Sequence, residues 1–520
     1  MTETSVLVAG GSLVGLSAGL FLAARGVPNI VVEPHLGSHP HPRAIGYTPR
    51  TLELFHTVGI ANRIPEAPPG FRLTRVKADS LAGTWQAPTE WTPAEKVTAD
   101  ADPARFSPYR GAAIAQDKLE PILRDRAREL GARLELGAEV VAFAQDATGV
   151  TTTIRDRATG ATREIRSAYL IAADGATSRI RETLGITRSG RGHIRTVRSV
   201  LFRAELEMYL ARGVHQFSIE QPEMTAFLTS YGDGRWVLMF LDDRERTDDE
   251  TAAAIARAIG RSDVEFEILA AGRWELAASI ADRFALGRVF LAGDAAHVLP
   301  PTRGGFGANT GIHDAYDLAW KLAAVLAGES TPRLLDTYDA ERRPVAWERL
   351  RQTFARPDYA KEAAGIADGV ELFDDVAMEL GQLYRSSAVA GVGPELPAAA
   401  RPDAWCGQPG TRAPHVPQGD RSTLDLFGAS WVLVVGNATV AWNAPVARVS
   451  AALGIPVVLA PVDTAARAAF GLGADGASLV RPDGVIAWRA SSAPAEPERE
   501  LGAALATVAS AARVLRFSMP

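Results

Sequence analysis

Two glycine-rich turns are the places where this sequence could bind a ligand that carries phosphates and sugars. The first, Gly10-Gly11-Ser12-Leu13-Val14-Gly15, follows the apolar run Ser5–Ala9 and opens an apolar helix that reaches about Ala24. Gly10 allows a tight turn, and Gly15 allows the helix and strand to pack closely. The free N–H groups and partial positive charge at the start of such a helix suit a pyrophosphate.

A carboxylate follows this turn at a spacing typical of ribose recognition. Glu33 ends a second apolar run, Asn29–Val32, and lies 23 residues after Gly10. Its oxygens can accept hydrogen bonds from the ribose hydroxyls of an adenosine. Ser12 stands where the pattern prefers a second glycine, but it is small enough for the backbone to approach phosphates. The order of strand, turn, helix, strand and acid predicts a dinucleotide-binding β-α-β unit, without separating FAD from NAD.

The second turn favours FAD. Val289–Pro301 (VFLAGDAAHVLPP) predicts a buried strand with Asp294 at its carboxyl end, where open α/β sheets bind ligands. A carboxylate there can bond a polyol such as the flavin ribityl chain. The glycines of Gly304–Asn309 allow a flat ring to approach the backbone, ahead of a helix expected to begin near Asp314. The dipole of that helix can stabilise negative charge on a reduced flavin. For His297, a structural role is favoured over that of a catalytic base.

These turns, together with the segment Ala173–Arg181 (ADGATSRIR), resemble the three fingerprints of the class A FAD-dependent aromatic hydroxylases. In that family the first fingerprint binds the ADP part of FAD. The Asp-Gly segment is implicated in both FAD and NAD(P)H binding, and the Gly-Asp segment binds the ribityl chain. Further similar segments begin at Pro42, Gln116, Asp314 and Leu334. The chain is most similar to the hydroxylases of polycyclic aromatic polyketides, of the anthracycline and tetracenomycin type.

The resemblance implies an FAD-dependent monooxygenase that uses NADPH or NADH and O₂. In the family, O₂ adds at the flavin C4a carbon of the reduced cofactor, and the hydroperoxide then hydroxylates an electron-rich ring, here a planar, phenolic polycyclic aromatic. Arg43 and Gln116 should contact FAD by this resemblance. The complete set of residues expected to bind FAD is Gly10, Ser12, Leu13, Val14, Gly15, Glu33, Pro34, His35, Arg43, Gln116, Val140, Asp174, Asp294, Pro301, Gly304, Gly305, Gly307, Ala308 and Asn309.

Two features depart from the family pattern. Ser12 replaces a glycine, and the stretch from His297 to Asn309 is one residue longer than the commonest form, through Thr302-Arg303. The added length would lie beside the flavin ring.

The elements that must position these residues predict an α/β protein of three domains. The first is a Rossmann-like FAD-binding domain of the para-hydroxybenzoate hydroxylase type. Alternating segments such as Ser199–Ala204 and Thr225–Thr229 predict an antiparallel sheet that binds the substrate. Ala399–Pro417 has the composition of a linker, and a thioredoxin-like α/β domain follows it. The expected bounds are 1–75, 103–186 and 275–398 for the first domain, 76–102 and 187–274 for the second, and 399–520 for the third.

The second domain does not reveal the catalytic base. Tyr209, His215, Tyr231 and Trp236 are candidates or neighbours of a pocket, but none lies in a motif. Four apolar residues there suit either a pocket for a planar ligand or an ordinary sheet core, and the core is favoured. These are Met224, Phe227, Leu238 and Phe240.

Composition excludes several functions. The net charge of −6 gives no reason to expect nucleic acid, and no run is long and apolar enough to span a membrane. The single cysteine, Cys406, cannot form a CxxC pair or a cysteine zinc site, so a buried or idle thiol in a reducing cytoplasm is expected. Without CxxC, the C-terminal domain should have a structural or dimerisation role, in a monomer or homodimer.

Two alternatives to hydroxylation stay open. One is a Baeyer–Villiger or oxidative ring-rearranging enzyme, which would use the same oxygen-carrying flavin as a nucleophile. The other is a flavin-binding protein without turnover, against which the Asp174-Gly175 segment argues.

Overall fold

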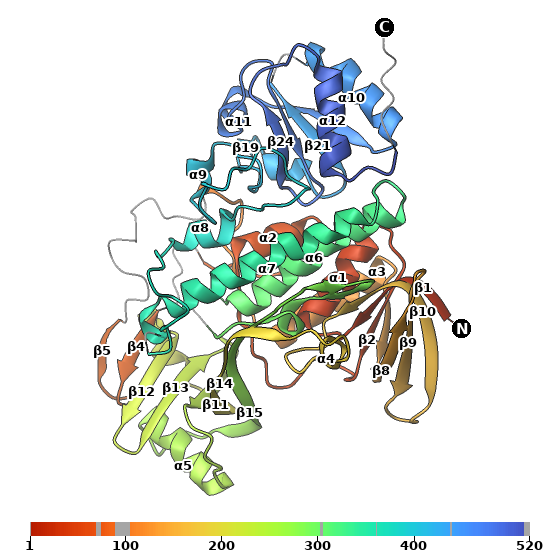
Figure 1. The fold of residues 1–520 in the computed structure, drawn as a ribbon. Coiled ribbons are helices and arrows are strands. Elements are labelled where there is room, and N and C mark those ends of the chain that lie inside the picture. Colours follow the sequence, from red (N-terminus) through yellow and green to blue (C-terminus); the bar gives the residue numbers. More distant parts are fainter. Residues whose placement is uncertain are drawn as a thin grey trace.

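The chain folds around two eight-stranded sheets and a smaller four-stranded sheet (Figure 1). A computed structural model describes residues 2–68, 74–88, 105–301, 305–359, 361–436 and 439–513. In Figure 1 the C-terminal sheet forms a separate blue unit, and the second eight-stranded sheet, mostly yellow and green with an orange-red edge, lies at the opposite end of the molecule.

The first sheet has the order β16-β17-β10-β1-β2-β7, and the four neighbouring pairs from β17 to β7 are parallel. The end of strand β1 is buried on both faces of the sheet, which explains why residues 6–9 form an unbroken apolar run in the sequence. A hairpin of β8 and β9 is joined to β10. The strands are β1 (Thr2–Ala9), β2 (Asn29–Glu33), β7 (Arg133–Leu136), β8 (Ala138–Gln145), β9 (Val150–Asp156), β10 (Thr162–Ala172), β16 (Ala285–Leu286) and β17 (Val289–Leu291).

The parallel direction brings three expected site residues, and the glycine that precedes Asp294, to one edge. Gly10, Glu33, Asp174 and Gly293 each lie at or just after the carboxyl end of a different strand of this sheet. Parallel strands share that edge, so residues far apart in the chain become neighbours.

Helices cover this sheet, and two long ones lie between it and the C-terminal unit (Figure 1). The pair α1 and α6 pack directly on each other, as do α6 and α7. The helices are α1 (Leu13–Ala24), α2 (Pro49–His56), α3 (Gln116–Glu129), α4 (Arg179–Thr183), α6 (Phe306–Leu326), α7 (Arg333–Phe354) and α8 (Asp375–Leu380). A small two-stranded sheet of β3 (Gly46–Tyr47) and β6 (Ala112–Ala113) lies beside them.

The second sheet has the order β18-β15-β11-β14-β13-β12-β4-β5. The expectation of an antiparallel sheet needs one correction, because β12 pairs with β4 in parallel. The longest strand pair in this sheet is that of β11 and β15, and α5 (Asp248–Ile259) covers one face of the sheet. The strands are β4 (Arg75–Ala78), β5 (Trp85–Pro88), β11 (Arg188–Arg203), β12 (Gln216–Gln221), β13 (Met224–Ser230), β14 (Arg235–Phe240), β15 (Glu267–Ala281) and β18 (His297–Val298).

The C-terminal sheet has the order β22-β21-β23-β24, with β21 parallel to β22 and antiparallel to β23. Its elements are β21 (Trp431–Val435), α10 (Val440–Leu453), β22 (Val457–Pro461), α11 (Thr464–Ala469), β23 (Ala477–Val480), β24 (Ile486–Ala490) and α12 (Pro497–Val508). Before it come α9 (Pro402–Trp405) and a hairpin of β19 (Pro417–Gln418) and β20 (Arg421–Ser422). Cys406 is exposed, so of the expected alternatives, a buried or an idle thiol, burial does not hold and an idle thiol stays a prediction.

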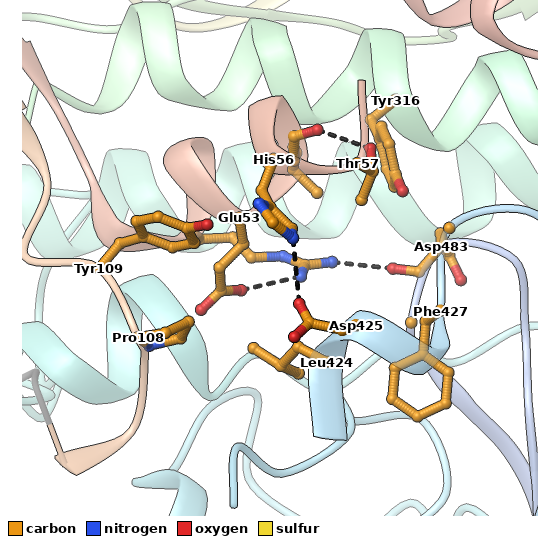
Figure 2. Close-up of a pocket in the computed structure, with 14 residues that line it drawn as sticks. Glu53, His56, Thr57, Pro108, Tyr109, Tyr316, Leu424, Asp425, Phe427 and Asp483 are labelled. Atoms are coloured by element: carbon orange, nitrogen blue, oxygen red, sulfur yellow. Dashed lines mark hydrogen bonds and ion pairs between the residues drawn. The ribbon is translucent and has the colours of Figure 1, made fainter. Parts of the chain in front are cut away.

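The segment expected to be a linker is packed against the FAD-binding part. Arg412 is buried and donates to both carboxylate oxygens of Glu53 on α2, at 2.5 and 2.8 Å. Arg50 donates to Glu53 and to the main-chain carbonyl of Asp483, and His56 contacts the Asp425 carboxylate at 3.0 Å (Figure 2). Composition alone predicted a linker, but the buried Arg412–Glu53 pair attaches the segment to α2, while Arg50 and His56 contact Asp483 and Asp425 in the chain that follows it.

A second buried cluster joins the C-terminal unit to the long helices. Arg481 donates to Glu341 on α7 at 2.6 Å, and Lys321 on α6 donates to Asp317 and Glu341 at 2.7 and 2.8 Å. Asp483 also accepts from Arg481. Three acids therefore face two bases away from water, so one acid is short of a full counter-charge. Among the described residues, no helix is long and apolar enough to cross a membrane.

The acid excess predicts a pH-dependent stability. Burial raises the pKa of Asp317 to about 7, and the opposing attraction of Lys321 does not cancel that effect. Because this pKa is higher in the folded than in the unfolded chain, the proton on Asp317 stabilises the fold below about pH 4, and that contribution is lost as pH rises through about 7. Asp317→Asn removes this titration. Between about pH 5 and 8 the wild type should lose about 1 to 3 kcal/mol of unfolding free energy relative to the variant.

Urea unfolding of both proteins across that range measures the difference. A difference that did not change with pH would contradict the assignment of the excess acid to Asp317.

Candidate functional site

The first glycine turn is too crowded for a side chain at Gly10 and at Gly15. Gly10 has a φ of +100°, and a Cβ atom there would lie 2.2 Å from the carbonyl oxygen of Ala173. A Cβ on Gly15 would lie 1.8 Å from the carbonyl oxygen of Gly10. These distances are far below van der Waals contact, so the turn requires both glycines and holds the start of α1 directly against the sheet edge.

The amino end of α1 offers its N–H groups. Ser12 precedes the helix without a side-chain cap, and the first turn contains no acid. Gly11 donates its N–H to Glu33 Oε2 at 2.6 Å, and His35 donates its N–H to Glu33 Oε1 at 2.9 Å. The Glu33 carboxylate is therefore fixed beside the turn, as ribose recognition would require.

Ser12, the departure from the glycine pattern, has a specific bonding role. Its hydroxyl donates to the buried carboxylate of Glu120 at 2.7 Å and accepts from Gln116 Nε2 at 2.9 Å. Gln116 in turn exchanges main-chain and side-chain hydrogen bonds with Ala44. A glycine could make none of the Ser12 bonds, so the serine ties α1 to α3 and to the segment that follows Arg43.

The second turn meets the first at a single side chain. Gly293 has a φ of +61°, and a Cβ there would lie 2.8 Å from Val14 Cγ2. A Cβ on Gly311 in α6 would lie 2.5 Å from the same methyl carbon and 2.9 Å from Gly293 Cα. Val14 therefore fills the space that the two glycines leave open, and the turns at Gly10 and Gly293 are held together.

Arg43 and Asp294 face each other beside this contact. Their charged groups lie 4.0 Å apart, and their side chains are 69% and 35% exposed. Asp294 belongs to a short 3₁₀ turn, η5 (Gly293–Ala295), at the end of β17. With Gln116 close to Ala44, the fold brings Arg43, Gln116 and Asp294 to the same edge of the sheet from three distant parts of the chain.

The helix after the second turn begins earlier than expected. It starts at Phe306 rather than near Asp314, because Gly305 takes a left-handed conformation with a φ of +56° and ends the preceding loop. Gly307, Ala308 and Asn309 are therefore in the first turn of α6. The Asn309 amide is buried and bonded to Thr48, Thr51, Gly46 and Gly305, which leaves its side chain occupied within the protein. Gly304, with Thr302 and Arg303, lies outside the described residues.

The other expected residues lie on several different elements. Pro34 and His35 follow β2, Val140 is half-buried in β8, and the Pro301 carbonyl accepts from Tyr359 at 2.8 Å. Asp174 Oδ1 is buried without a hydrogen-bond partner in the described part of the protein. Burial raises the pKa of Asp174, so this carboxylate sits where an incoming donor would be favourable.

Sequence reasoning missed the buried acid beneath the second turn. Asp314 accepts from the Gly293 N–H at 3.2 Å, from His297 Nε2 at 2.7 Å and from Arg342 Nε at 2.8 Å. All of these side chains are fully buried. The burial of His297 and its bond to Asp314 agree with the structural role expected for it. A family-like segment begins at Asp314, but no local pattern showed that this acid would contact the second turn, because Gly293, His297 and Arg342 are distant from it in the sequence.

The second sheet sorts its candidate residues by face. Met224, Leu238, Phe240 and Trp236 are buried in the cluster under α5, which confirms the core interpretation for them. Side chains alternate between the two faces along β13, so Phe227, three residues after Met224, lies on the opposite face from Met224. There it is the cross-strand neighbour of Met239. The structure therefore separates Phe227 from the other three apolar candidates.

The opposite face of this sheet meets the FAD-binding part. Met239 and Trp274 pack on the core of the first sheet, and Ser199 hydrogen-bonds His41 at 3.0 Å. Tyr231 donates to the carbonyl of Pro42 at 2.5 Å, directly before Arg43. Among the remaining base candidates, Tyr209 lies partly buried beside the cluster under α5. Burial lowers the pKa of His215.

This geometry defines a protein of the FAD-binding α/β class, and comparisons with known proteins agree. Residues 3–353 match the family model of an FAD-binding domain, and residues 406–512 match that of the aromatic-ring hydroxylase C-terminal region. The chain is similar to the tetracenomycin A2 monooxygenase-dioxygenase of Streptomyces glaucescens, with 39% identity over 97% of this chain and 96% of that protein. It is equally similar to a 4-methyl-5-nitrocatechol 5-monooxygenase of a Burkholderia species, with 39% identity over 97% of both chains.

A solved structure extends the likeness to three dimensions. The aklavinone-11 hydroxylase, crystallised with FAD and aklavinone, aligns with a TM-score of 0.87 and 36% identity, over 98% of this chain and 99% of that one. The chain belongs to the family of FAD-dependent aromatic-ring hydroxylases. It is an FAD-dependent aromatic monooxygenase with NAD(P)H as co-substrate.

The contact at Val14 can be tested by a double-mutant cycle. Gly311→Ala should destabilise the protein by about 1 to 3 kcal/mol, because the new methyl group overlaps Val14. In the double variant with Val14→Ala, the loss should be smaller than the sum of the single losses by at least about 0.5 kcal/mol. Urea unfolding of the apoprotein measures all three. Gly307→Ala is the matched control on the same helix, because its Cβ meets nothing within 4 Å. Strictly additive losses would refute the contact.

Proposed function

We propose that this enzyme binds FAD along the edge that joins the two turns and hydroxylates a phenolic polycyclic aromatic substrate. The observation that carries the proposal is the meeting of Gly293, Gly311 and Val14, because it sets the two turns next to each other. The pyrophosphate would lie at the amino end of α1, the adenosine ribose at Glu33, and the ribityl chain at Asp294 with Arg43 and Gln116.

The residues present fit FAD. Glycines leave the backbone open at the pyrophosphate position, and Asp174 has a buried oxygen with no partner among the described residues. Bound FAD would transfer electrons from NAD(P)H to O₂, and O₂ would provide the oxygen atom that enters the substrate. The uncapped amino end of α6, with no acid in its first turn, suits the negative charge of a reduced flavin ring.

The protein's own part in the reaction is binding, orientation and exclusion of water. The second sheet turns Phe227 and Met239 toward the FAD-binding part, and this face is the proposed wall of the substrate site. Apolar and aromatic groups favour a flat aromatic ligand, and the polar Ser199 and His41 pair lies on the same face.

The substrate class rests on the relatives. The names of two of them refer to tetracenomycin A2 and aklavinone, which favours a polycyclic substrate of polyketide type. The 4-methyl-5-nitrocatechol relative supports the same ring chemistry on a smaller phenol. Ortho or para hydroxylation follows, because an electrophilic oxygen attacks the electron-rich positions of a phenol.

The finer assignments extend this proposal. The division into three domains follows the three sheets, with the second sheet as the substrate domain. The strand order β22-β21-β23-β24 and its directions support a thioredoxin-like C-terminal domain with a structural role. A cytoplasmic monomer or homodimer stays a prediction.

The site assignment predicts that Asp294→Ala removes most of the retained flavin, because the variant loses the carboxylate proposed to bond the ribityl chain. The measurement is the FAD content of purified protein by absorbance, and the FAD dissociation constant of the apoprotein by fluorescence. A loss of affinity of about 10- to 100-fold is expected for a hydrogen bond to a charged group. Asp339→Asn is the control, because this acid bonds the Phe284 N–H and Arg343 and is not among the residues proposed to bind FAD. Stoichiometric FAD in Asp294→Ala would contradict the assignment.

The reaction is tested with the FAD-loaded wild type, NADPH or NADH, O₂ and a panel of polyphenolic polyketides and simpler catechols. The product mass should rise by one oxygen atom, and the substrate should stimulate NAD(P)H oxidation. A product with a cleaved or expanded ring would favour the Baeyer–Villiger alternative.

The two faces of β13 give a second prediction. Phe227→Ala should raise KM for the aromatic substrate by about tenfold, because it removes an aromatic wall while most of the fold is kept. Met224→Ala, on the same strand, should lower stability by about 2 to 5 kcal/mol and leave KM unchanged, since Met224 lies in the core under α5. Steady-state kinetics and thermal unfolding of both variants measure this split. Equal KM values for Phe227→Ala and the wild type would exclude this face as the substrate wall.

A further inference from the structure

A fully buried carboxylate lies beneath the turn that carries Asp294. Asp314 Oδ2 accepts from the Gly293 N–H at 3.2 Å and from His297 Nε2 at 2.7 Å. Gly293 and His297 stand on either side of Asp294 in the chain. One carboxylate oxygen therefore holds both ends of the short segment whose middle is proposed to bond the ribityl chain.

The other oxygen of Asp314 is held by a buried cation. Arg342 on α7 donates from Nε to Asp314 Oδ1 at 2.8 Å, from Nη1 to Tyr384 at 2.6 Å and from Nη2 to the carbonyl of Thr310 at 3.2 Å. Burial alone would raise the pKa of Asp314, but His297 and Arg342 together hold it below its usual value. Asp314 is thus an ionised acceptor with three donors, which is the condition for keeping a charge in the interior.

The bond to Asp314 also sets the state of the His297 ring. Because Nε2 donates to the carboxylate, a neutral His297 carries its proton on Nε2 and leaves Nδ1 as an acceptor. His297 Nδ1 is buried and has no hydrogen-bond partner in the described part of the chain. Among the described residues, Asp314 is therefore the polar contact that orients the imidazole.

The turn needs such support because its backbone is unusual. Gly293 has a left-handed φ, its Cα approaches Gly311, and Asp294 at the next position is partly exposed. A hydrogen bond from the Gly293 N–H to an ionised acid fixes the peptide plane that leads into Asp294. Without that acceptor, a buried N–H would be left unpaired at a cost of about 1 to 3 kcal/mol.

A neighbouring cluster provides a contrast. Asp317 lies one turn further along α6, and Glu341 directly precedes Arg342 on α7. Both belong to the buried cluster with Lys321 and Arg481, which joins the C-terminal unit. In the described part of the protein, neither acid is bonded to the segment from Gly293 to His297. The same two helices thus carry one ion cluster at the turn and another at the C-terminal unit.

We infer that Asp314, held by Arg342, is a positioning residue for the flavin, because it fixes the conformation of the Gly293–His297 segment that presents Asp294. This inference rests on the proposed FAD site. It assigns to Asp314 no contact with FAD or with the substrate; its effect passes through the turn.

The test compares two identical chemical changes one helical turn apart. Asp314→Asn removes the ionised acceptor of the turn, and Asp317→Asn makes the same change in the other cluster. Apoprotein of each variant and of the wild type is titrated with FAD, followed by quenching of flavin fluorescence. Asp314→Asn should raise the FAD dissociation constant by about 10- to 100-fold, whereas Asp317→Asn should leave it at the wild-type value. The absorption maxima of bound FAD are recorded as a second signature.

A stability control separates positioning from general loss of structure. Glu341→Gln leaves Lys321 and Arg481 with less negative charge in the interior, so it should lower the unfolding temperature strongly. The inference expects its FAD affinity to stay close to that of the wild type at a temperature where it is folded. It is overturned if Glu341→Gln weakens FAD as much as Asp314→Asn does, or if Asp314→Asn binds FAD like the wild type.

A milder variant covers the case in which Asp314→Asn does not fold. Arg342→Lys keeps the positive charge but cannot bond Asp314, Thr310 and Tyr384 in one plane, so it should loosen the acid without neutralising it. Its FAD affinity should fall between those of the wild type and Asp294→Ala, and a wild-type value would overturn the inference. Failure of the proposed site itself looks different, because then Asp294→Ala would also bind FAD like the wild type.

Discussion

The close approach of two backbone turns at Val14 is the constraint on which the rest of the site depends. Gly293 and Gly311 leave room for the valine methyl groups only because neither has a Cβ, and Gly15 allows α1 to lie against Gly10 in the same way. As a result, the backbones of α1, α6 and the edge of the first sheet lie in close contact at these glycines. Every polar group proposed to bind FAD is placed relative to this contact.

Buried charge then determines how the outer parts attach to this centre. Three buried ion clusters lie where separate parts of the chain pack together. They are Asp314 with Arg342 under the second turn, Glu341 with Lys321 and Arg481 at the C-terminal unit, and Glu53 with Arg412 at α2. Such groups are costly to bury unless they are paired, so each cluster specifies one way for its segments to pack. The C-terminal unit, which has no dithiol, contributes Arg481 and Arg412 to this framework and closes the far side of the long helices (Figure 1).

Local patterns predicted much of this protein because they record local constraints. The β-α-β unit and the acid at Glu33 could be read from spacing, and the core role of Met224, Leu238 and Phe240 was favoured because large apolar side chains are usually buried. The early start of α6 at Phe306 was not predicted. The glycines of Gly304–Asn309 were interpreted as a loop, whereas the loop ends at Gly305 and Gly307 is already helical. The segment around Arg412 was misread as a linker for a similar reason, because composition does not reveal a buried partner such as Glu53.

The sequence by itself determined the class of cofactor site, because strand, glycine turn and helix lie next to one another in the chain and their chemistry depends on that order. It also determined the ring-hydroxylating family, through segments that resemble known ones. Only the tertiary structure decided which groups meet across long separations: Val14 with Gly293 and Gly311, Arg43 with Asp294, and Asp314 with His297 and Arg342. Their contacts depend on how helices and sheet edges pack, and no spacing along the chain encodes those distances.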